Sequence, residues 1–177
     1  EVMMNRLVLV CLVAVFLFAN CQKKEEPKVQ APFPAGTMAM QDKILQLQES
    51  LRQNPKNMNA RIDLGNSLMD AGRFPEAVDA YQKALEIDPK NTDVRVDMGT
   101  CYRSAGQPDR AAEEYRKAIA LNPGHPNAHR NLGIVLAFDF KNKREAIKEF
   151  EEYLRVAPNA PDTQKISQLI AELKKSK

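Results

Sequence analysis

Two histidines are the first place in the chain where residue types and spacing could support chemistry. His125 and His129 lie four residues apart, a spacing that can put two zinc ligands on one face of a helix. Pro126 favours a helix that starts after His125, and no third ligand lies nearby in the sequence. We therefore expect no metal site and no cofactor, with His125 in a loop and His129 in a packed position. A metal-dependent enzyme built on these two residues is the catalytic alternative, and it requires stoichiometric metal in the purified protein.

Adjacent acidic residues are the other candidates for proton transfer, and they occur as Glu113-Glu114 and Glu151-Glu152. Acid–base catalysis needs groups positioned within reach of one substrate, whereas neighbours in a helix point in different directions. We expect these pairs to lie on solvated helix faces. Because the sequence also lacks a glycine-rich phosphate loop and a nucleophile motif, it predicts a protein that is not an enzyme.

The elements that carry these residues follow an internal repeat of 34 residues. An apolar residue followed by glycine returns three times, and each time an alanine, an aromatic residue and a proline come after it. The members of this pattern are Leu64-Gly65, Met98-Gly99 and Leu132-Gly133, then Ala77 and Tyr81, Ala111 and Tyr115, Ala146 and Phe150, and finally Pro89, Pro123 and Pro158.

Residues that end one helix and start the next recur in the first two repeats. Gly72 and Gly106 can take the left-handed conformation that ends a helix, and Pro75 and Pro108 suit the first turn of the next helix. Between these signals the apolar residues follow the 3, 4, 7, 8 spacing of an amphipathic helix, and no period-two alternation occurs. The sequence therefore predicts an all-α protein.

This pattern resembles the tetratricopeptide repeat (TPR), a helix-turn-helix unit. The resemblance implies a right-handed superhelical solenoid of antiparallel helix pairs over residues 57–158, with units at 58–91, 92–125 and 126–160. A single unit cannot bury its apolar face, so neighbours must stack. Glycine inside a helix costs about 1 kcal/mol relative to alanine, so the repeated glycines indicate close helix contact. The third unit has one extra residue, which we expect in its turn around Phe140 and Asn142.

The segments that flank the repeats have the pattern of caps. Residues 38–56 carry apolar residues in helical phase and are predicted to form an N-terminal capping helix. Residues 159–177 carry isoleucines and leucines on one face and lysines on the other, which predicts a C-terminal capping helix. Terminal repeats need a polar outer surface, and both segments meet this need.

The resemblance also implies a concave groove, lined by the first helix of each unit, that receives a peptide or a helix of a partner protein. Asparagine amides there could hold a peptide backbone, arginines could grip a carboxylate, and aspartates would favour a basic partner. The predicted groove residues are Asn59, Asp63, Asn66, Asp70, Asp97, Arg103, Arg130 and Asn131.

The groove residues argue against one known specialisation of TPR proteins. The carboxylate clamp that reads the acidic tails of cytosolic chaperones uses lysines and an arginine, and of its five positions only Asn66 fits here. The other four positions hold Ile62, Asp97, Asn127 and Asn131. We therefore do not expect this class of ligand.

The start of the chain has the pattern of an export signal. Arg6 precedes thirteen apolar residues, 7–19, which is short of the roughly twenty that span a bilayer and typical of a secretory signal. The following Phe18-Ala19-Asn20-Cys21 resembles a bacterial lipobox. We predict a signal peptide at 1–20 and lipidation of Cys21. A retained membrane anchor and a cleaved soluble periplasmic form are the alternatives.

Residues 21–37 are rich in proline and charge and are predicted to be a disordered tether. Gln22 directly after the lipidated cysteine favours the outer membrane over the inner membrane. Of the three cysteines, Cys11 and Cys21 belong to this region, and Cys101 is expected to be a buried apolar residue without reactivity.

Composition narrows the function further. The chain carries a net charge of +3 with 28% charged residues, and its basic and acidic residues are interspersed, which does not suit nucleic-acid binding. The sequence therefore predicts a non-enzymatic adaptor, tethered with its body in the periplasm, that binds a segment of an envelope assembly partner and could self-associate. A second hypothesis is an inner-membrane-anchored helper of cytochrome c maturation that holds an apocytochrome segment.

Overall fold

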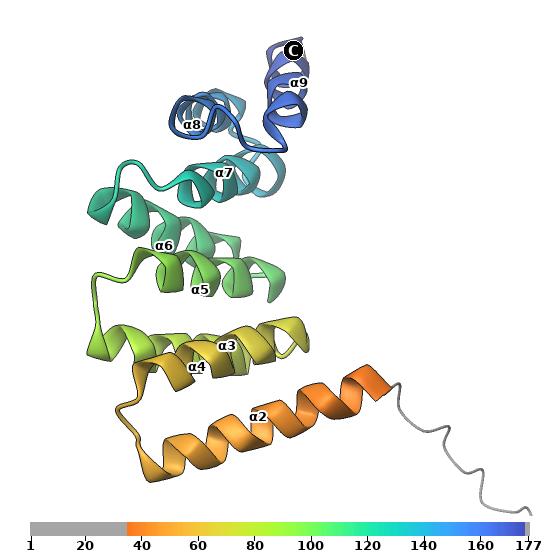
Figure 1. Cartoon of the computed structure of the whole chain (residues 1–177). Coiled ribbons are helices and arrows are strands. Elements are labelled where there is room, and N and C mark those ends of the chain that lie inside the picture. The colour runs from red at the N-terminus through yellow and green to blue at the C-terminus, as the bar shows by residue number, and fades with distance from the viewer. Residues whose placement is uncertain (1–34, 176–177) are drawn as a thin grey trace, which may run out of the picture. The chain divides into compact units, whose positions relative to one another are not determined.

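The computed structural model describes residues 35–175, and this part of the chain contains helices and no strand. The prediction of an all-α solenoid is confirmed. The helices pair as three hairpins between two flanking helices (Figure 1). They are α2 (Ala35–Gln53), α3 (Met58–Asp70), α4 (Phe74–Ile87), α5 (Thr92–Ser104), α6 (Pro108–Leu121), α7 (Pro126–Ile134), the π-helix η1 (Val135–Asp139), α8 (Lys143–Val156) and α9 (Thr163–Lys175).

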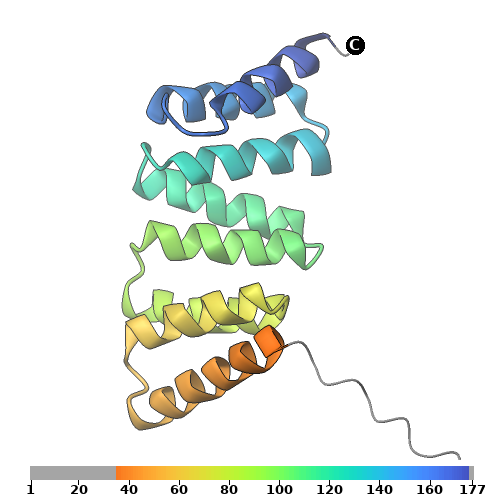
Figure 2. The same ribbon diagram turned by 45° about the vertical axis from the view of Figure 1, so that its right-hand side comes forward.

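The helices stack in chain order, as both ribbon views show (Figures 1 and 2). α3 packs on α4, α5 on α6 and α7 on α8 within the units, and α4 packs on α5 and α6 on α7 between them. α2 covers one end through α3, and α9 covers the other through α8. The buried apolar residues form one continuous core along the stack, as expected where each unit shares its apolar face with the next.

The first helix of each unit starts with the same kind of N-cap. Asn57, Asn91 and His125 each cap the first helix of a unit, and each accepts the backbone N–H three residues later, at 3.1, 3.1 and 3.3 Å respectively. His125 lies outside the helix, directly before Pro126, as predicted. It is also a buried N-cap, in which a ring nitrogen accepts the hydrogen bond that an asparagine oxygen accepts in the other units. Gly72 and Gly106 end the first helices at φ 72° and 74°, as predicted.

The repeated glycines meet the repeated aromatic side chains. A Cβ on Gly65 would lie 2.5 Å from Cε1 of Tyr81, and a Cβ on Gly133 would lie 2.6 Å from Cε1 of Phe150. Both rings are fully buried. Each aromatic ring thus lies against the bare backbone of its partner helix, which confirms the close helix contact that the repeated glycines indicate.

The extra residue of the third unit lies in the helix and not in the turn, so that expectation is wrong. Lys141, with φ 57°, takes the place of Gly72 and Gly106, and in all three units the next helix begins two residues later. The added residue is taken up by η1, where the N–H of Phe140 bonds to the carbonyl of Val135 at 3.0 Å, five residues back. A π-turn widens the helix locally, and Val135 stays fully buried.

The flanking helices differ in extent from their predicted segments. α2 begins at Ala35, so residues 35–37 of the predicted tether are helical, and it ends at Gln53, before residue 56. α9 occupies residues 163–175 of the predicted 159–177. The predicted signal peptide, the lipidation site Cys21 and residues 21–34 of the tether lie outside the described residues. Among residues 35–175, no helix is long and apolar enough to cross a membrane.

Candidate functional site

The first helices of the units form one continuous surface, because α3 packs directly against α5 and α5 against α7. This surface is hollowed between α5 and α7. A cavity of about 70 Å³ opens there, and its lining includes two of the predicted groove residues: the full set is Thr100, Arg103, Ser104, Tyr115, Asn131 and Ile134. The stack therefore positions the predicted groove residues of neighbouring units side by side.

Two of the three asparagines predicted for the groove, Asn66 and Asn131, are half-buried and already hydrogen-bonded. Oδ1 of Asn66 accepts the hydroxyl proton of Tyr81 at 2.7 Å, which leaves its amide NH₂ free to donate. Nδ2 of Asn131 lies 3.4 Å from Oγ1 of Thr100. The bond to the buried tyrosine orients Asn66, so its free donor points in a defined direction for a partner's backbone carbonyl.

The two arginines chosen from the sequence each pair with an acid of a later element. Nε of Arg103 donates to Asp139 at 2.7 Å, and Nε of Arg130 donates to Asp162 at 2.6 Å. The sequence interpretation missed both carboxylates, because they lie 36 and 32 residues further along the chain. A partner carboxylate would have to compete with these pairs, so the arginines bind units together in the described structure.

The aspartates differ in burial. Asp63 and Asp70 of α3 are exposed, as is Asn59, and none of the three side chains makes a hydrogen bond within residues 35–175. Asp97 is half-buried, and burial together with the nearby charge of Asp93 raises its pKa to about 6. The groove is thus acidic along α3 and α5, with one carboxyl that titrates near neutrality.

Both histidine rings make hydrogen bonds within the protein. Nε2 of His125 bonds with Asp93 at 3.0 Å. Nδ1 of His129 bonds with Glu149 at 2.7 Å, and its Nε2 bonds with the carbonyl of Pro123 at 2.9 Å. Across the described part of the chain, no three histidine, cysteine or acidic side chains come together as metal ligands. The histidines connect loops and helices.

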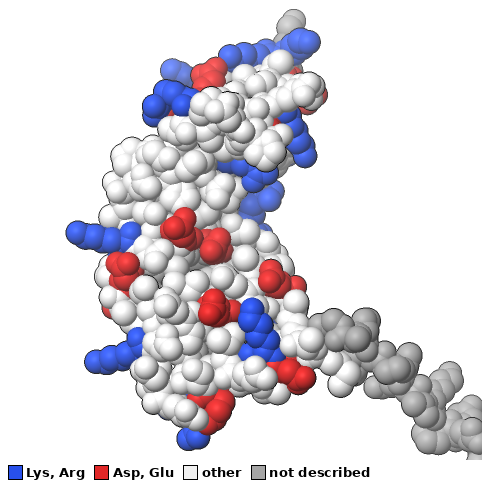
Figure 3. Space-filling model, viewed as in Figure 1, with Lys and Arg blue, Asp and Glu red and all other residues white. Residues whose placement is uncertain are grey.

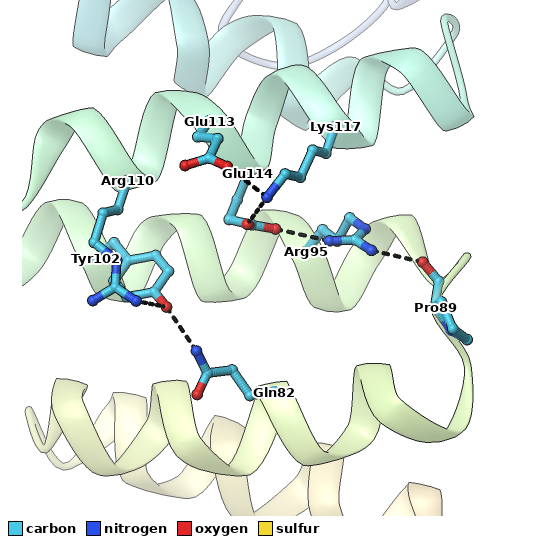
Figure 4. A network of polar contacts seen from close by, with 8 residues as sticks. All are labelled: Gln82, Pro89, Arg95, Tyr102, Arg110, Glu113, Glu114 and Lys117. Carbon is cyan, nitrogen blue, oxygen red and sulfur yellow. Dashed lines mark hydrogen bonds and ion pairs between the residues drawn. The ribbon is translucent and has the colours of Figure 1, made fainter.

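Glu114 corrects the expectation of a solvated face. It is buried, and it accepts from Arg95 at 2.9 Å and from Lys117 at 2.9 Å (Figure 4). Arg95 also donates to the carbonyl of Pro89 at 2.8 Å, so α5, α6 and the loop between units share one polar cluster. Glu113 on the same helix is exposed. Glu114 thus joins α5 to α6 through its ion pairs.

Cys101 is confirmed as a buried residue of α5, and it has no disulfide partner among residues 35–175. Burial, and secondarily the charge of Asp97, raises the pKa of its thiol to about 12. The thiol therefore stays protonated at neutral pH, where thiolate chemistry would need the opposite shift.

Helix hairpins at a 34-residue period, glycine–aromatic contacts within each hairpin and a surface of first helices define a tetratricopeptide-repeat protein. A family model described as the TPR domain of cytochrome c-type biogenesis protein H matches residues 28–164. The chain belongs to this family. TPR folds of this kind act in protein–protein interaction. No curated protein matches the chain.

Solved structures share the fold. A crystal structure of MamA aligns with a TM-score of 0.70 at 22% identity, covering 78% of this chain and 81% of that chain. The first TPR domain of Spaghetti (RPAP3), bound to an HSP90 peptide, aligns at 0.57 with 27% identity over 64% and 93%. The TPR domain of Arabidopsis OM64 aligns at 0.61 with 15% identity over 65% and 94%.

Proposed function

We propose that this protein is a non-enzymatic adaptor that holds a polypeptide segment of a partner during cytochrome c maturation, with an apocytochrome as the partner. The observation that carries the proposal is the match to the cytochrome c-type biogenesis TPR family over residues 28–164. These residues include all three first helices, α3, α5 and α7. A similar TPR domain, that of Spaghetti (RPAP3), has been solved with a bound peptide, which supports a groove as the binding mode.

The charge of the groove supports a basic partner segment. Asp63, Asp70 and Asp93 are exposed along α3 and α5, and Asp97 lies half-buried among them. Complementary charge speeds encounter and selects partners. Figure 3 shows acidic side chains over the middle of one face and basic side chains around the end with α8 and α9. An acidic tail, such as the peptide bound by Spaghetti (RPAP3), would meet like charge at α3 and α5.

The test compares two charge-reversed variants of the full chain that carry the same change in net charge. Asp63→Lys with Asp70→Lys alters the groove, and Glu86→Lys with Asp109→Lys alters exposed residues of the second helices α4 and α6. Binding of haem-free cytochrome c polypeptide is measured by titration calorimetry. We expect the groove variant to bind about tenfold or more weakly, because close charge pairs contribute on the order of 1.5 kcal/mol or more, and the control to bind as the parent does.

Two results would count against the proposal. Failure of the parent to bind the apocytochrome removes the cytochrome assignment, and cross-linking in native membranes would then identify another envelope partner for the adaptor. Equal loss in both variants would mean that net charge, and not the groove, controls binding.

We also propose that the body is tethered in the bacterial envelope through lipidated Cys21 and faces the periplasm, with Gln22 favouring the outer membrane. This lipid anchor replaces the inner-membrane anchor with which the cytochrome hypothesis was stated above. The lipobox-like Phe18-Ala19-Asn20-Cys21 supports this anchor. Mass spectrometry of the mature N-terminus is the test. An acylated peptide that begins at Cys21 is expected, and an intact segment 1–20 would show the inner-membrane anchor instead.

A further inference from the structure

A second hollow lies at the C-terminal end of the groove, between α7–η1 and α9. Its volume is about 430 Å³, several times that of the hollow between α5 and α7. Apolar side chains from both walls line it, and charged side chains surround them. The lining residues are Arg130, Ile134, Phe138, Asp162, Lys165, Ile166, Gln168, Leu169 and Glu172.

The π-turn supplies the aromatic side chain of this hollow. Phe138 stands three residues before Lys141, the position that Met69 and Arg103 hold before the glycines that end α3 and α5. Phe138 is 47% exposed, although Leu136 and Ala137 beside it are buried. The residue added in η1 therefore keeps the core filled while it directs a large apolar ring outward. Single-turn π-bulges recur at functional sites.

The wall formed by α9 is held in place. Asp162, which precedes α9, accepts from Arg130 at 2.6 Å and also accepts the hydroxyl proton of Tyr153. Ile166 and Ile170 are buried against the core. Because this end of α9 is fixed before any partner arrives, ordering the wall adds little to the cost of binding.

Two charges of the hollow remain for a partner. Arg130 and Asp162 neutralise each other, whereas Lys165 and Glu172 are exposed and make no ion pair within residues 35–175. They lie seven residues apart on α9, which is two helical turns or about 10.5 Å. The hollow therefore offers one positive and one negative contact at a set separation, with apolar surface beside them.

Resting on the proposed function, we infer that this hollow is the anchoring subsite of the groove. Its occupant is an amphipathic segment of the partner polypeptide that inserts large apolar side chains between Ile134, Phe138 and Leu169. The segment places an acidic group at Lys165 and a basic group at Glu172. Aromatic residues in pockets commonly dominate binding energy, so Phe138 anchors the segment and the two charges set its register.

The experiment uses three helical peptides that carry leucines along one face and two charged positions seven residues apart. The positions hold Glu and Lys, two Glu, or two Lys. Affinities for the full chain are measured by fluorescence anisotropy. The Glu/Lys peptide should bind the parent most tightly. Lys165→Glu should shift the preference to the Lys/Lys peptide and Glu172→Lys to the Glu/Glu peptide, each by about tenfold.

Phe138→Ala should weaken all three peptides by about tenfold or more. The ring is half exposed, so helical content should be retained, and circular dichroism checks this. Gln164→Ala, on an exposed position of α9 outside the hollow, should leave the affinities unchanged.

Several results would overturn the inference: no peptide binding, equal affinity for the three peptides, or no effect of Phe138→Ala. If Phe138→Ala instead abolishes a concentration-dependent increase in sedimentation rate without affecting the peptides, the occupant is a second copy of the chain and the inference is also wrong. The apocytochrome titration with Asp63→Lys and Asp70→Lys is independent of these results. Failure of the subsite inference therefore does not contradict the proposed adaptor function, and failure of the adaptor function does not contradict the peptide results.

Discussion

At the scale of single residues, the groove side chains divide into those with intramolecular partners and those available to a ligand. Asn66, Arg103 and Arg130 have partners at 2.6–2.7 Å. Asp63 and Asp70 are exposed without hydrogen bonds among the described residues. The engaged residues order the surface, and the exposed carboxylates carry its charge.

Asp97 should make stability depend on pH. Its pKa is raised from 3.8 to about 6 by burial, so between these values the folded state binds more protons than the unfolded state. Stability contributed by the protonated carboxyl is therefore lost as pH rises through this range. Asp97→Asn should stabilise the fold at about pH 7 by on the order of 1 kcal/mol, a value reduced for solvent screening, and by little near pH 4.

Urea unfolding of parent and variant at both pH values measures this difference. Asp63→Asn, an exposed change on the preceding first helix, should stay within about 0.5 kcal/mol at either pH. A gain from Asp97→Asn that is the same at both pH values would show that the carboxyl does not titrate in this range.

At the scale of the helix pair, the contact between glycine and an aromatic ring sets how closely two helices approach. A Cβ on Gly99 would lie 2.6 Å from Cε1 of Tyr115, which is 1% exposed. The ring is enclosed in the continuous apolar core, which leaves it little room to move away. Each hairpin is therefore intolerant of even one added methyl group at this point.

Gly99→Ala should destabilise the protein even though alanine favours helix. Overpacking costs about 1–3 kcal/mol, and the gain in helix propensity returns about 1 kcal/mol, so a net loss of up to about 2 kcal/mol is expected in urea unfolding. Gly124→Ala is the matched control, because the nearest atom to its added Cβ lies 3.6 Å away. Similar losses for both variants would contradict the close approach.

At the scale of the whole stack, each unit contacts only its neighbours, so a local change at one end should stay local. Asp162 joins α7, α8 and α9 through Arg130 and Tyr153. At the other end, α2 packs on α3 and shares none of these bonds. Stability therefore need not be uniform along the described residues.

Asp162→Ala should reduce amide hydrogen-exchange protection in α8 and α9 by about tenfold or more, since a hydrogen bond to a charged group contributes about 1.5–3 kcal/mol. Protection in α3 and α4 should not change. Hydrogen exchange measured by mass spectrometry resolves these segments. Gln164→Ala, in the first turn of α9, is the control. A uniform loss of protection along the chain would show that the stack unfolds as one cooperative unit.

The sequence by itself determined the period, the hairpins, the ends of the first helices in the first two units and the close helix contact at the repeated glycines. These features can be read from the sequence because they repeat: Gly65 returns as Gly99 and Gly133 at intervals of 34 residues, and Gly72 returns as Gly106. The resemblance to the TPR implied the surface of first helices and the groove residues on it, and the binding role of these residues stays a prediction.

Only the tertiary structure decided which of those side chains form ion pairs within the protein and where the extra residue of the third unit lies. Asp139 reaches Arg103 and Asp162 reaches Arg130 across 36 and 32 residues, and Glu114 is buried by Arg95 of the neighbouring helix. Such pairs depend on how one helix is rotated against the next, which spacing along the chain does not report. The extra residue lies in η1 because a helix can change from α to π hydrogen bonding more easily than it can expose Val135 and Leu136, which are buried.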